Sequence, residues 1–467
     1  MEQVLIIILV IVGTLIFVSS IDDLLVDILI AVKRAGRSSH DLPKAGAFKH
    51  AGKRYPQIGI FIANWHEEDI LEPMIEGNLR QIRYRPLRFY LGVYPNDEGT
   101  RSAALRLAVK YPRQVEVITN PENGPTSKGQ MLNVMFNEVF ASGHKSPDLA
   151  VIHDSEDIID PLSFDCYAQN ARRYDFIQIP VFSLDSRHRS WVGAHYMEEF
   201  AERHSREMVL RKILGVMIPS AGVGTCLTRR LIRHFLRTRQ SVMVGDCLTE
   251  DYVLGAEVHR AGFKATFTRV AYDETPIATR EYFPKTIWSA VRQKTRWTYG
   301  IAFESTRKLG WAGKPRDKYF FFRDRKGAVM NLLPPVSLLL VLIGFGYGVQ
   351  PPENTLFAAV WLVCVLNLAA AAIRYGVKLR AFRQVYGFWD ALGILARWPL
   401  AILINFLAAT FAWRRFLGSA FASRPVAWDK THHELPETFA AASYAAALSR
   451  HVQKQEHTST NKPQLAA

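Results

Sequence analysis

The chain has 467 residues, of which 49% are hydrophobic, and a formal net charge of +15. A mean hydropathy near zero is too apolar for a typical soluble enzyme and too polar for a pure membrane bundle, so the composition indicates a soluble domain joined to a few membrane segments. Basic residues gather beside hydrophobic runs, as at residues 33–37 and 374–383, and no nucleic-acid-reading motif occurs. The location of the positive charge therefore indicates anionic lipid as a partner and favours a membrane over nucleic acid, so no nucleic-acid partner is expected.

The first 50 residues predict a transmembrane anchor and a juxtamembrane segment. Residues 4–20 are nearly all aliphatic and about long enough to cross a bilayer. The basic cluster behind them places the N-terminus outside and the following domain inside. Residues 21–32 carry three aspartates, which favours a helix lying along the membrane interface.

Residues 51–326 predict a cytoplasmic α/β domain with a mostly parallel sheet. Short apolar runs alternate there with helical patterns, which is typical of βα units. The predicted strands are residues 58–63, 89–93, 115–118 and 149–152.

The fourth of these strands leads directly into the carboxylates Asp154, Glu156 and Asp157. In open α/β sheets, ligands bind at the carboxyl ends of the strands. Two carboxylates one residue apart can hold a divalent cation, and the cation can hold a diphosphate. The alternative is a solvated acidic loop or a helix N-terminus that favours acids.

Residues 289–300 predict a helix on which Gln293, Arg296 and Trp297 share one face. A guanidinium can bind phosphate oxygens in a fork, and an indole can stack on a sugar. The alternative is an ordinary amphipathic helix with Trp297 in the core.

Glu250 and Asp251 follow Thr249 at the start of another helical run. An acid pair at this point can supply a general base. The same three residues also fit a capping pattern, with Thr249 as the cap and the acids in the first turn.

Beyond the α/β domain, residues 327–375 predict a transmembrane hairpin with spans at 329–349 and 356–373. Residues 376–449 are expected to form interfacial helices, because a crossing at 388–413 would put Arg414 and Arg415 outside. Residues 450–467 are polar and are expected to be disordered.

Taken in order, these motifs resemble the family 2 glycosyltransferases, in particular the membrane-bound, processive, cellulose-synthase-like branch, over about residues 55–435. A bacterial inner-membrane subfamily is the most similar. The segments that carry this likeness are Tyr94-Pro95-Asn96-Asp97, Gly124-Pro125-Thr126-Ser127-Lys128, His153-Asp154-Ser155-Glu156-Asp157 and Trp428-Asp429-Lys430-Thr431-His432. The resemblance implies a GT-A fold, that is, a Rossmann-like nucleotide-diphospho-sugar transferase domain, in a multi-pass protein of the bacterial inner membrane.

The same resemblance implies roles for the donor-side residues. Glu68 and Asp97 would contact the uridine of a UDP-sugar, and Lys128 would lie near the diphosphate. Asp154 and Glu156 would bind Mg²⁺ or Mn²⁺. The glutamate departs from the family's DxD pattern, which leaves open whether Glu156 or Asp157 completes the metal site.

On the acceptor side, the resemblance makes Asp251 the catalytic base, with Glu250 beside it. Gln293, Arg296 and Trp297 would bind the acceptor and the diphosphate. Residues 222–225 match a loop beside the acceptor, and residues 428–432 match a cytoplasmic segment that closes over the nucleotide.

The implied activity is processive, inverting transfer from a UDP-sugar to a growing polysaccharide. Two alternatives remain: transfer of a single sugar to a lipid or protein acceptor, and a non-catalytic envelope scaffold or phage-receptor component. The presence of Asp251 and of the Gln293, Arg296 and Trp297 motif argues against the scaffold, whereas Glu156 favours it. The expected partners are the UDP-sugar donor, a glycan acceptor, membrane lipids, an envelope or outer-membrane export partner and, because three spans are few for a channel, further copies of the chain.

Overall fold

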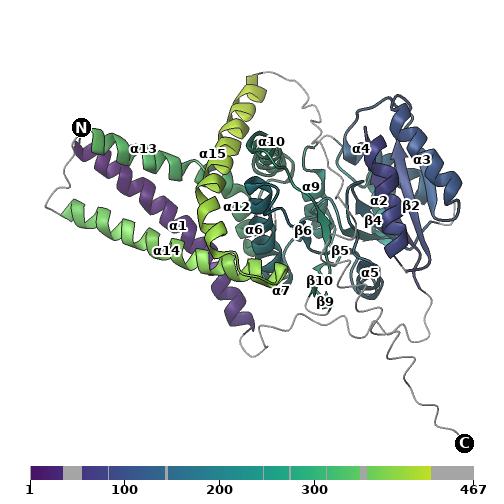
Figure 1. Ribbon diagram of the computed structural model, residues 1–467, viewed down its shortest axis with the longest axis horizontal. Coiled ribbons are helices and arrows are strands. Elements are labelled where there is room, and N and C mark those ends of the chain that lie inside the picture. The colour runs from purple at the N-terminus through teal and green to yellow at the C-terminus, as the bar shows by residue number, and fades with distance from the viewer. Residues whose placement is uncertain are drawn as a thin grey trace, which may run out of the picture.

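The computed structural model describes residues 2–34, 55–82, 84–141, 146–245, 247–272, 275–311, 313–347 and 355–421. An α/β domain lies at the right of Figure 1, and long apolar helices extend from it to the left. The predicted nucleotide-closing segment at 428–432, the hairpin turn at 350–354 and the tail at 450–467 lie outside the described residues.

A seven-stranded sheet with the order β3-β2-β1-β4-β7-β5-β8 forms the centre of the α/β domain. Its strands are β1 (Ile58–Ala63), β2 (Leu87–Val93), β3 (Val115–Thr119), β4 (Leu149–His153), β5 (Phe176–Gln178), β7 (Thr225–Thr228) and β8 (Ala265–Phe267). β1 pairs in parallel with β2 and β4, whereas β7 runs antiparallel to β4 and β5. This confirms the mostly parallel sheet and the four predicted strands. Because β1, β2 and β4 are parallel, the residues that follow them meet at one edge.

Helices cover both faces of this sheet. The helices of the domain are α2 (Glu68–Gln81), α3 (Glu98–Lys110), α4 (Lys128–Ala141), α5 (Ser163–Asn170), α6 (Trp191–Ser205), α7 (Glu207–Leu214), α8 (Arg229–Arg239), α9 (Glu250–Arg260), α10 (Ile287–Thr298), the π-helix η1 (Tyr299–Glu304), α11 (Ser305–Leu309) and α12 (Pro315–Met330). Two short pairs complete the domain, β6 (Val181–Ser183) with β11 (Thr279–Glu281) and β9 (Ala271–Tyr272) with β10 (Thr275–Pro276).

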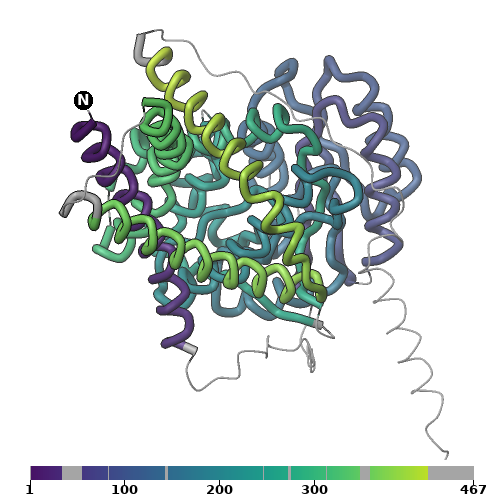
Figure 2. The backbone as a smooth tube through the Cα atoms, turned by 60° about the vertical axis from the view of Figure 1, so that its left-hand side comes forward, coloured from purple at the N-terminus to yellow at the C-terminus, as the bar shows by residue number. Residues whose placement is uncertain are grey.

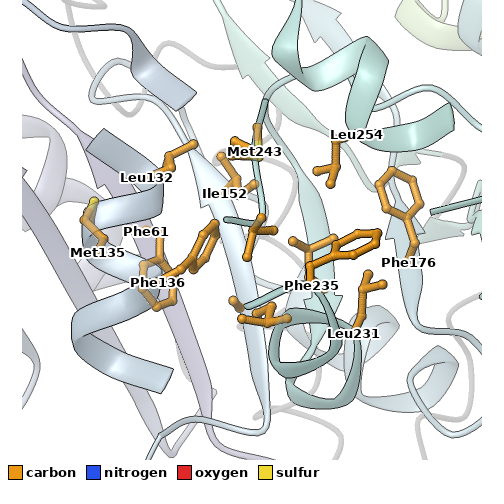
Figure 3. Packing of buried hydrophobic residues seen from close by; sticks show 14 of the residues in the cluster. Phe61, Leu132, Met135, Phe136, Ile152, Phe176, Leu231, Phe235, Met243 and Leu254 are labelled. Carbon is orange, nitrogen blue, oxygen red and sulfur yellow. The ribbon is translucent and has the colours of Figure 1, made fainter. Parts of the chain in front are cut away.

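The alternation of side chains along β1 explains the two hydrophobic cores. Phe61 faces α4, where its ring centroid lies 4.9 Å from that of Phe136, in the cluster that also contains Phe235 of α8 (Figure 3). Its neighbour Ile60 faces the other side and packs in the cluster that contains Leu71 of α2. Each of these side chains is fully or almost fully buried, and burying one apolar side chain contributes about 1.5–3 kcal/mol.

The apolar part of the chain consists of α1 (Glu2–Arg34), α13 (Leu333–Gly346), α14 (Thr355–Tyr386) and α15 (Ala391–Phe421). Within the part of the chain that the structure describes, four helical segments are long and apolar enough to cross a membrane: Glu2–Lys33, Pro315–Gly346, Ala358–Tyr386 and Ala391–Gly418. α1, α13 and α14 run side by side (Figure 1). The protein is therefore membrane-associated. The second segment joins α12 to α13, so the expected boundary between residues 326 and 327 falls inside α12.

Residues 21–32 continue the same 33-residue helix α1 as the apolar residues before them, and their location along the membrane interface stays a prediction. Their aspartates bind cations of the α/β domain. Asp22 contacts Arg323 at 2.5 Å and Lys326 at 2.7 Å, and Asp27 contacts Arg206 at 2.7 Å. These pairs satisfy the acidic side chains without a bend in the helix.

α15 runs in a direction that crosses α13 and α14 (Figure 1), and with α14 it forms a V (Figure 2). One side of α15 packs against the domain: Ile404 is fully buried beside α10, and the Trp413 indole N–H donates to the carbonyl of Ala328 in α12 at 2.8 Å. Its length and composition also fit a membrane span, so the interfacial location of residues 388–413 stays a prediction.

Candidate functional site

The candidate site forms where β4 ends and α4 begins. Lys128, the first residue of α4, makes an ion pair with Asp154, which directly follows β4, and donates to the carbonyl of Gly222 at 3.2 Å. Burial alone would lower the pKa of the Lys128 ammonium, but the nearby carboxylates of Asp154, Glu250 and Asp157, with Asp154 the strongest, together raise it. The lysine is therefore a fixed positive charge at the carboxyl edge of the sheet.

The three acids after β4 have different surroundings. Asp157 is fully buried, and its Oδ2 lies 2.7 Å from His153 Nδ1 and accepts the backbone N–H of Asp154 at 3.0 Å. Burial raises the pKa of Asp157 well above its usual range and lowers the pKa of His153 to about 3. Asp157 is thus directed into the domain, whereas the side chain of Asp154 is 30% exposed.

Glu156 is the other candidate to complete a metal site with Asp154, and the choice between it and Asp157 stays a prediction. It is 5% exposed, and its Oε2 accepts the Ser155 hydroxyl at 3.2 Å. Carboxylate oxygens are the hard donors that Mg²⁺ and Mn²⁺ prefer, so this pair fits the implied metal by donor type.

Glu68 and Asp97, predicted to contact uridine, meet at the ends of β1 and β2. Asp97 is the N-cap of α3, where its Oδ1 accepts the Thr100 N–H at 3.3 Å and its Oδ2 accepts the His66 N–H at 2.7 Å. Glu68, at the exposed start of α2, accepts the Thr100 hydroxyl at 3.4 Å. The ligand atoms of His66, Glu68 and Asp97 all lie within 4.8 Å of one another, so these residues could also hold a metal ion.

Glu250 and Asp251 occupy the first turn of α9, as both interpretations of the sequence require. Thr249 makes no side-chain capping bond, however, so the capping interpretation is wrong for that residue. Its side chain instead abuts Gly300 of η1, where an added Cβ would lie 2.5 Å from Thr249 Cγ2. This close approach brings η1 against the start of α9.

Gly222 links the acid pair to the lysine. Its backbone has a φ of +80°, and an added Cβ would lie 3.0 Å from Asp251 Oδ2. The carbonyl of the same glycine accepts from Lys128. Gly129 plays a similar role for α4, since a Cβ there would lie 3.0 Å from Cγ of Glu250. The predicted residues Lys128, Asp154, Glu250 and Asp251 therefore form one cluster.

Burial controls the protonation of the acid pair. It raises the pKa of Asp251 and, together with the Asp251 charge, raises that of Glu250 to about 7. The positive charges of Lys128 and Arg296 act in the opposite direction on both acids. The site thus holds two carboxyl groups, Glu250 and Asp251, whose pKa values are raised although the cations Lys128 and Arg296 lie nearby.

The predicted motif lies on α10, as expected. Gln293 Oε1 and Arg296 Nε are buried and have no hydrogen-bond partner among the described residues. Such atoms are rare in proteins and are available to a ligand. Trp297 is half-buried and lies edge-on to Tyr196 and Phe200, with ring centroids 6.3 and 6.2 Å away. The core interpretation of Trp297 therefore holds for part of its ring.

Sequence reasoning missed two features next to this motif. One is the π-helix η1, whose Glu304 accepts the Leu248 N–H at 2.8 Å and so ties it to the loop before α9. Such helices are rare and often occur at functional sites. The other is Lys294, which is 4% exposed. Lys294 follows the buried Ala290 and Val291 by four and three residues, so helical periodicity places it on the same buried face. This spacing could have predicted its burial.

Several known proteins are similar to this chain. A family model described as "Glycosyltransferase like family 2" matches residues 56–300, more than half of the chain. Bacteriophage adsorption protein B of Escherichia coli (strain K12) is 28% identical over 459 residues, which cover 91% of this chain and 61% of that protein. Bacteriophage N4 adsorption protein B of Escherichia coli O157:H7 gives the same values. The chain spans about three fifths of the length of these curated relatives.

Among solved structures, the mannosyltransferase PcManGT from Pyrobaculum calidifontis in complex with GDP-Man and Mn²⁺ is similar, with a TM-score of 0.53 and 13% identity. The similarity covers 83% of this chain and 98% of that one. It confirms the GT-A fold implied by the motifs.

Proposed function

The chain belongs to glycosyltransferase family 2, and on that premise we propose that it transfers a sugar from a UDP-sugar to a growing polysaccharide, with inversion and processively. The observation that carries the proposal is the meeting of Lys128, Asp154 and Asp251 around Gly222. A fixed cation, an accessible carboxylate and a base of raised pKa are the three elements that this reaction needs in one place.

In the proposed step, Asp251 takes the proton from an acceptor hydroxyl while that oxygen attacks the anomeric carbon. The bond from this carbon to the diphosphate oxygen breaks, and the UDP leaves with the bonding electrons. Lys128 and Arg296 stabilise the charge that develops on the diphosphate. The pKa of about 7 for Glu250 lets it hold a proton beside an ionised Asp251.

Asp154 and Glu156 would hold Mg²⁺ or Mn²⁺, which when bound supplies further positive charge opposite the diphosphate. His66, Glu68 and Asp97 are the competing ligand set. Binding of Mn²⁺, followed by electron paramagnetic resonance, is expected to weaken in Asp154→Asn and to be unchanged in Glu68→Gln. The reverse pattern would move the metal site to the ends of β1 and β2.

We further propose that α1, α13 and α14 cross the bacterial inner membrane and that α15 lies at its cytoplasmic face. The support is charge: Arg374, Arg380 and Arg383 lie at the C-terminal end of α14, on the side where the α/β domain sits. The crossing direction of α15 and its packing on α10 support the interfacial location.

Polysaccharide export would require an envelope partner or a second copy of the chain, since few helices are available to enclose a glycan. The names of the two curated relatives favour a second candidate function, an envelope component needed for phage adsorption. Transfer of a single sugar to a lipid or protein acceptor is the third.

UDP release tests the proposal. The full chain, purified in detergent and repeated in native membranes, is given a panel of UDP-sugars and GDP-mannose with Mn²⁺ or Mg²⁺. We expect release from one UDP-sugar, at least about a hundredfold less release in Asp251→Asn, and a long glycan product. Asp69→Asn is the matched control, because Asp69 lies exposed in the first turn of α2. Release that is equal in the two variants would refute the assignment of Asp251.

A further inference from the structure

Lys294 lies inside the α10 motif, but its ammonium is directed away from the acid pair. It is 4% exposed and makes an ion pair with Glu199 of α6. It donates to Asn405 Oδ1 of α15 at 2.8 Å and lies 3.3 Å from His195 Nε2. Burial lowers the pKa of His195 to about 4, so this imidazole is neutral and accepts from the lysine.

The direction of Lys294 determines the direction of Arg296. Consecutive residues of an α-helix are about 100° apart, so side chains two positions apart project on nearly opposite sides. Lys294 contacts α6 and α15, whereas the charge of Arg296 acts on Glu250 and Asp251 of α9. The residues that bind Lys294 therefore also fix the rotation of α10 about its axis.

α15 supports α10 at several points along its length. Thr295 donates its hydroxyl to the carbonyl of Ala408 at 3.4 Å, three residues beyond Asn405. The rings of Trp288 and Phe411 have centroids 6.4 Å apart, and Ile404 is buried against α10. Two adjacent residues of the motif thus bond to α15 within one of its turns.

We propose that Lys294 is a positioning residue that Asn405 of α15 and Glu199 of α6 hold in place, so that Arg296 faces the donor diphosphate. α15 is then part of the site, because a helix of the membrane-associated region sets the orientation of the diphosphate-binding arginine. The part concerning the diphosphate rests on the proposed function; the support of α10 by α15 does not.

The first experiment measures hydrogen exchange of residues 287–298 in the full chain reconstituted in lipid nanodiscs. Asn405→Leu removes the acceptor for Lys294 at similar volume, whereas Asn405→Asp keeps an acceptor. We expect exchange of α10 to be roughly tenfold faster in Asn405→Leu and near that of the unchanged protein in Asn405→Asp. Thr410→Val is the control, because Thr410 is exposed on the same helix. Equal exchange in Asn405→Leu and Thr410→Val would overturn the support.

The second experiment measures the affinity for UDP with Mn²⁺ in Asn405→Leu, Arg296→Gln and the double variant. Non-additivity reports that two residues act through one interaction. We expect each single variant to bind about tenfold more weakly and the double variant to bind no more weakly than Arg296→Gln. Additive losses of UDP affinity would overturn positioning through Arg296. Asn405→Asp, measured in the same way, is expected to bind UDP like the unchanged protein, which a general loss of packing would not allow.

If the unchanged protein binds neither UDP nor GDP, the proposed function fails, and the exchange measurement still decides whether α15 supports α10. If Asn405→Leu does not fold, the pair Lys294→Met with Glu199→Gln replaces it in both measurements. That pair removes two opposite charges together and leaves no carboxylate unpaired.

Discussion

Replacing Lys128 with methionine is the most informative change at the site. The substitution keeps most of the volume of the side chain and removes the charge that contacts Asp154 and the carbonyl of Gly222. A hydrogen bond to a charged group contributes about 1.5–3 kcal/mol. If the lysine makes such a bond to the departing diphosphate, Lys128→Met lowers kcat roughly 10- to 150-fold.

The same change has a second, directional effect on pH dependence. The ammonium of Lys128 lowers the pKa values of Glu250 and Asp251 against the larger effect of burial. Removing it raises both values, so the base is protonated at a higher pH and activity disappears sooner as the pH falls. The acid limb of the UDP-release profile should therefore move to higher pH.

Lys110→Met provides the matched control. Lys110 forms an ion pair with Glu76 at 2.6 Å on the exposed surface of the domain. Its loss should change neither kcat nor the pH profile. A Lys128→Met protein with normal kcat and an unmoved acid limb would show that the lysine serves only to hold the end of β4.

Three further outcomes are expected. Gly222→Ala should lower kcat far more than Gly245→Ala. The Gly222 substitution adds about 1–2 kcal/mol of left-handed backbone strain and places a Cβ 3.0 Å from Oδ2 of the proposed base Asp251, whereas a Cβ at Gly245 meets no atom within 4 Å. Glu250→Gln should raise the melting temperature at pH 8 but not at pH 4, because a carboxyl whose folded pKa is raised from 4.5 to about 7 loses stability as the pH rises through that interval. Arg211→Met should destabilise the protein by about 3–5 kcal/mol in denaturant titrations, since it leaves two carboxylates without their buried partner, and a loss below 1 kcal/mol would contradict this.

The position of the site could be predicted from the sequence because it depends on strands. The apolar run of β4 and its parallel neighbours place Asp154 at the carboxyl edge whatever the details of the loops. The spacing of Gln293, Arg296 and Trp297 likewise requires only that α10 be a helix. Periodicity was sufficient to predict that these three residues share a face, whereas their place in the site was implied by the family resemblance.

The hydrogen-bond and ion-pair partners of side chains in loops, and of residues far apart in the sequence, could not be predicted. Asp157 is buried because His153 and a backbone N–H bind it, and no pattern in the sequence distinguishes it from Glu156. The aspartates of α1 suggested water at an interface, yet the partner of Asp22 is Arg323, 301 positions away. Lys294 is similar, since its partner Asn405 is 111 positions away.

The continuity of α1 has a mechanical consequence. One unbroken helix carries both the segment long enough to cross the bilayer and the aspartates that bind the α/β domain, so bilayer depth and domain orientation share a single rigid element. A helix rises 1.5 Å and turns 100° per residue. One residue inserted between the two halves would therefore rotate the acidic side of α1 away from Arg323 and Lys326. For the same reason, a bilayer that is thicker or thinner than the apolar half would strain these ion pairs. The strain would reach α12, whose Asp324 accepts the hydroxyl of Tyr252, the residue after Asp251, at 2.8 Å.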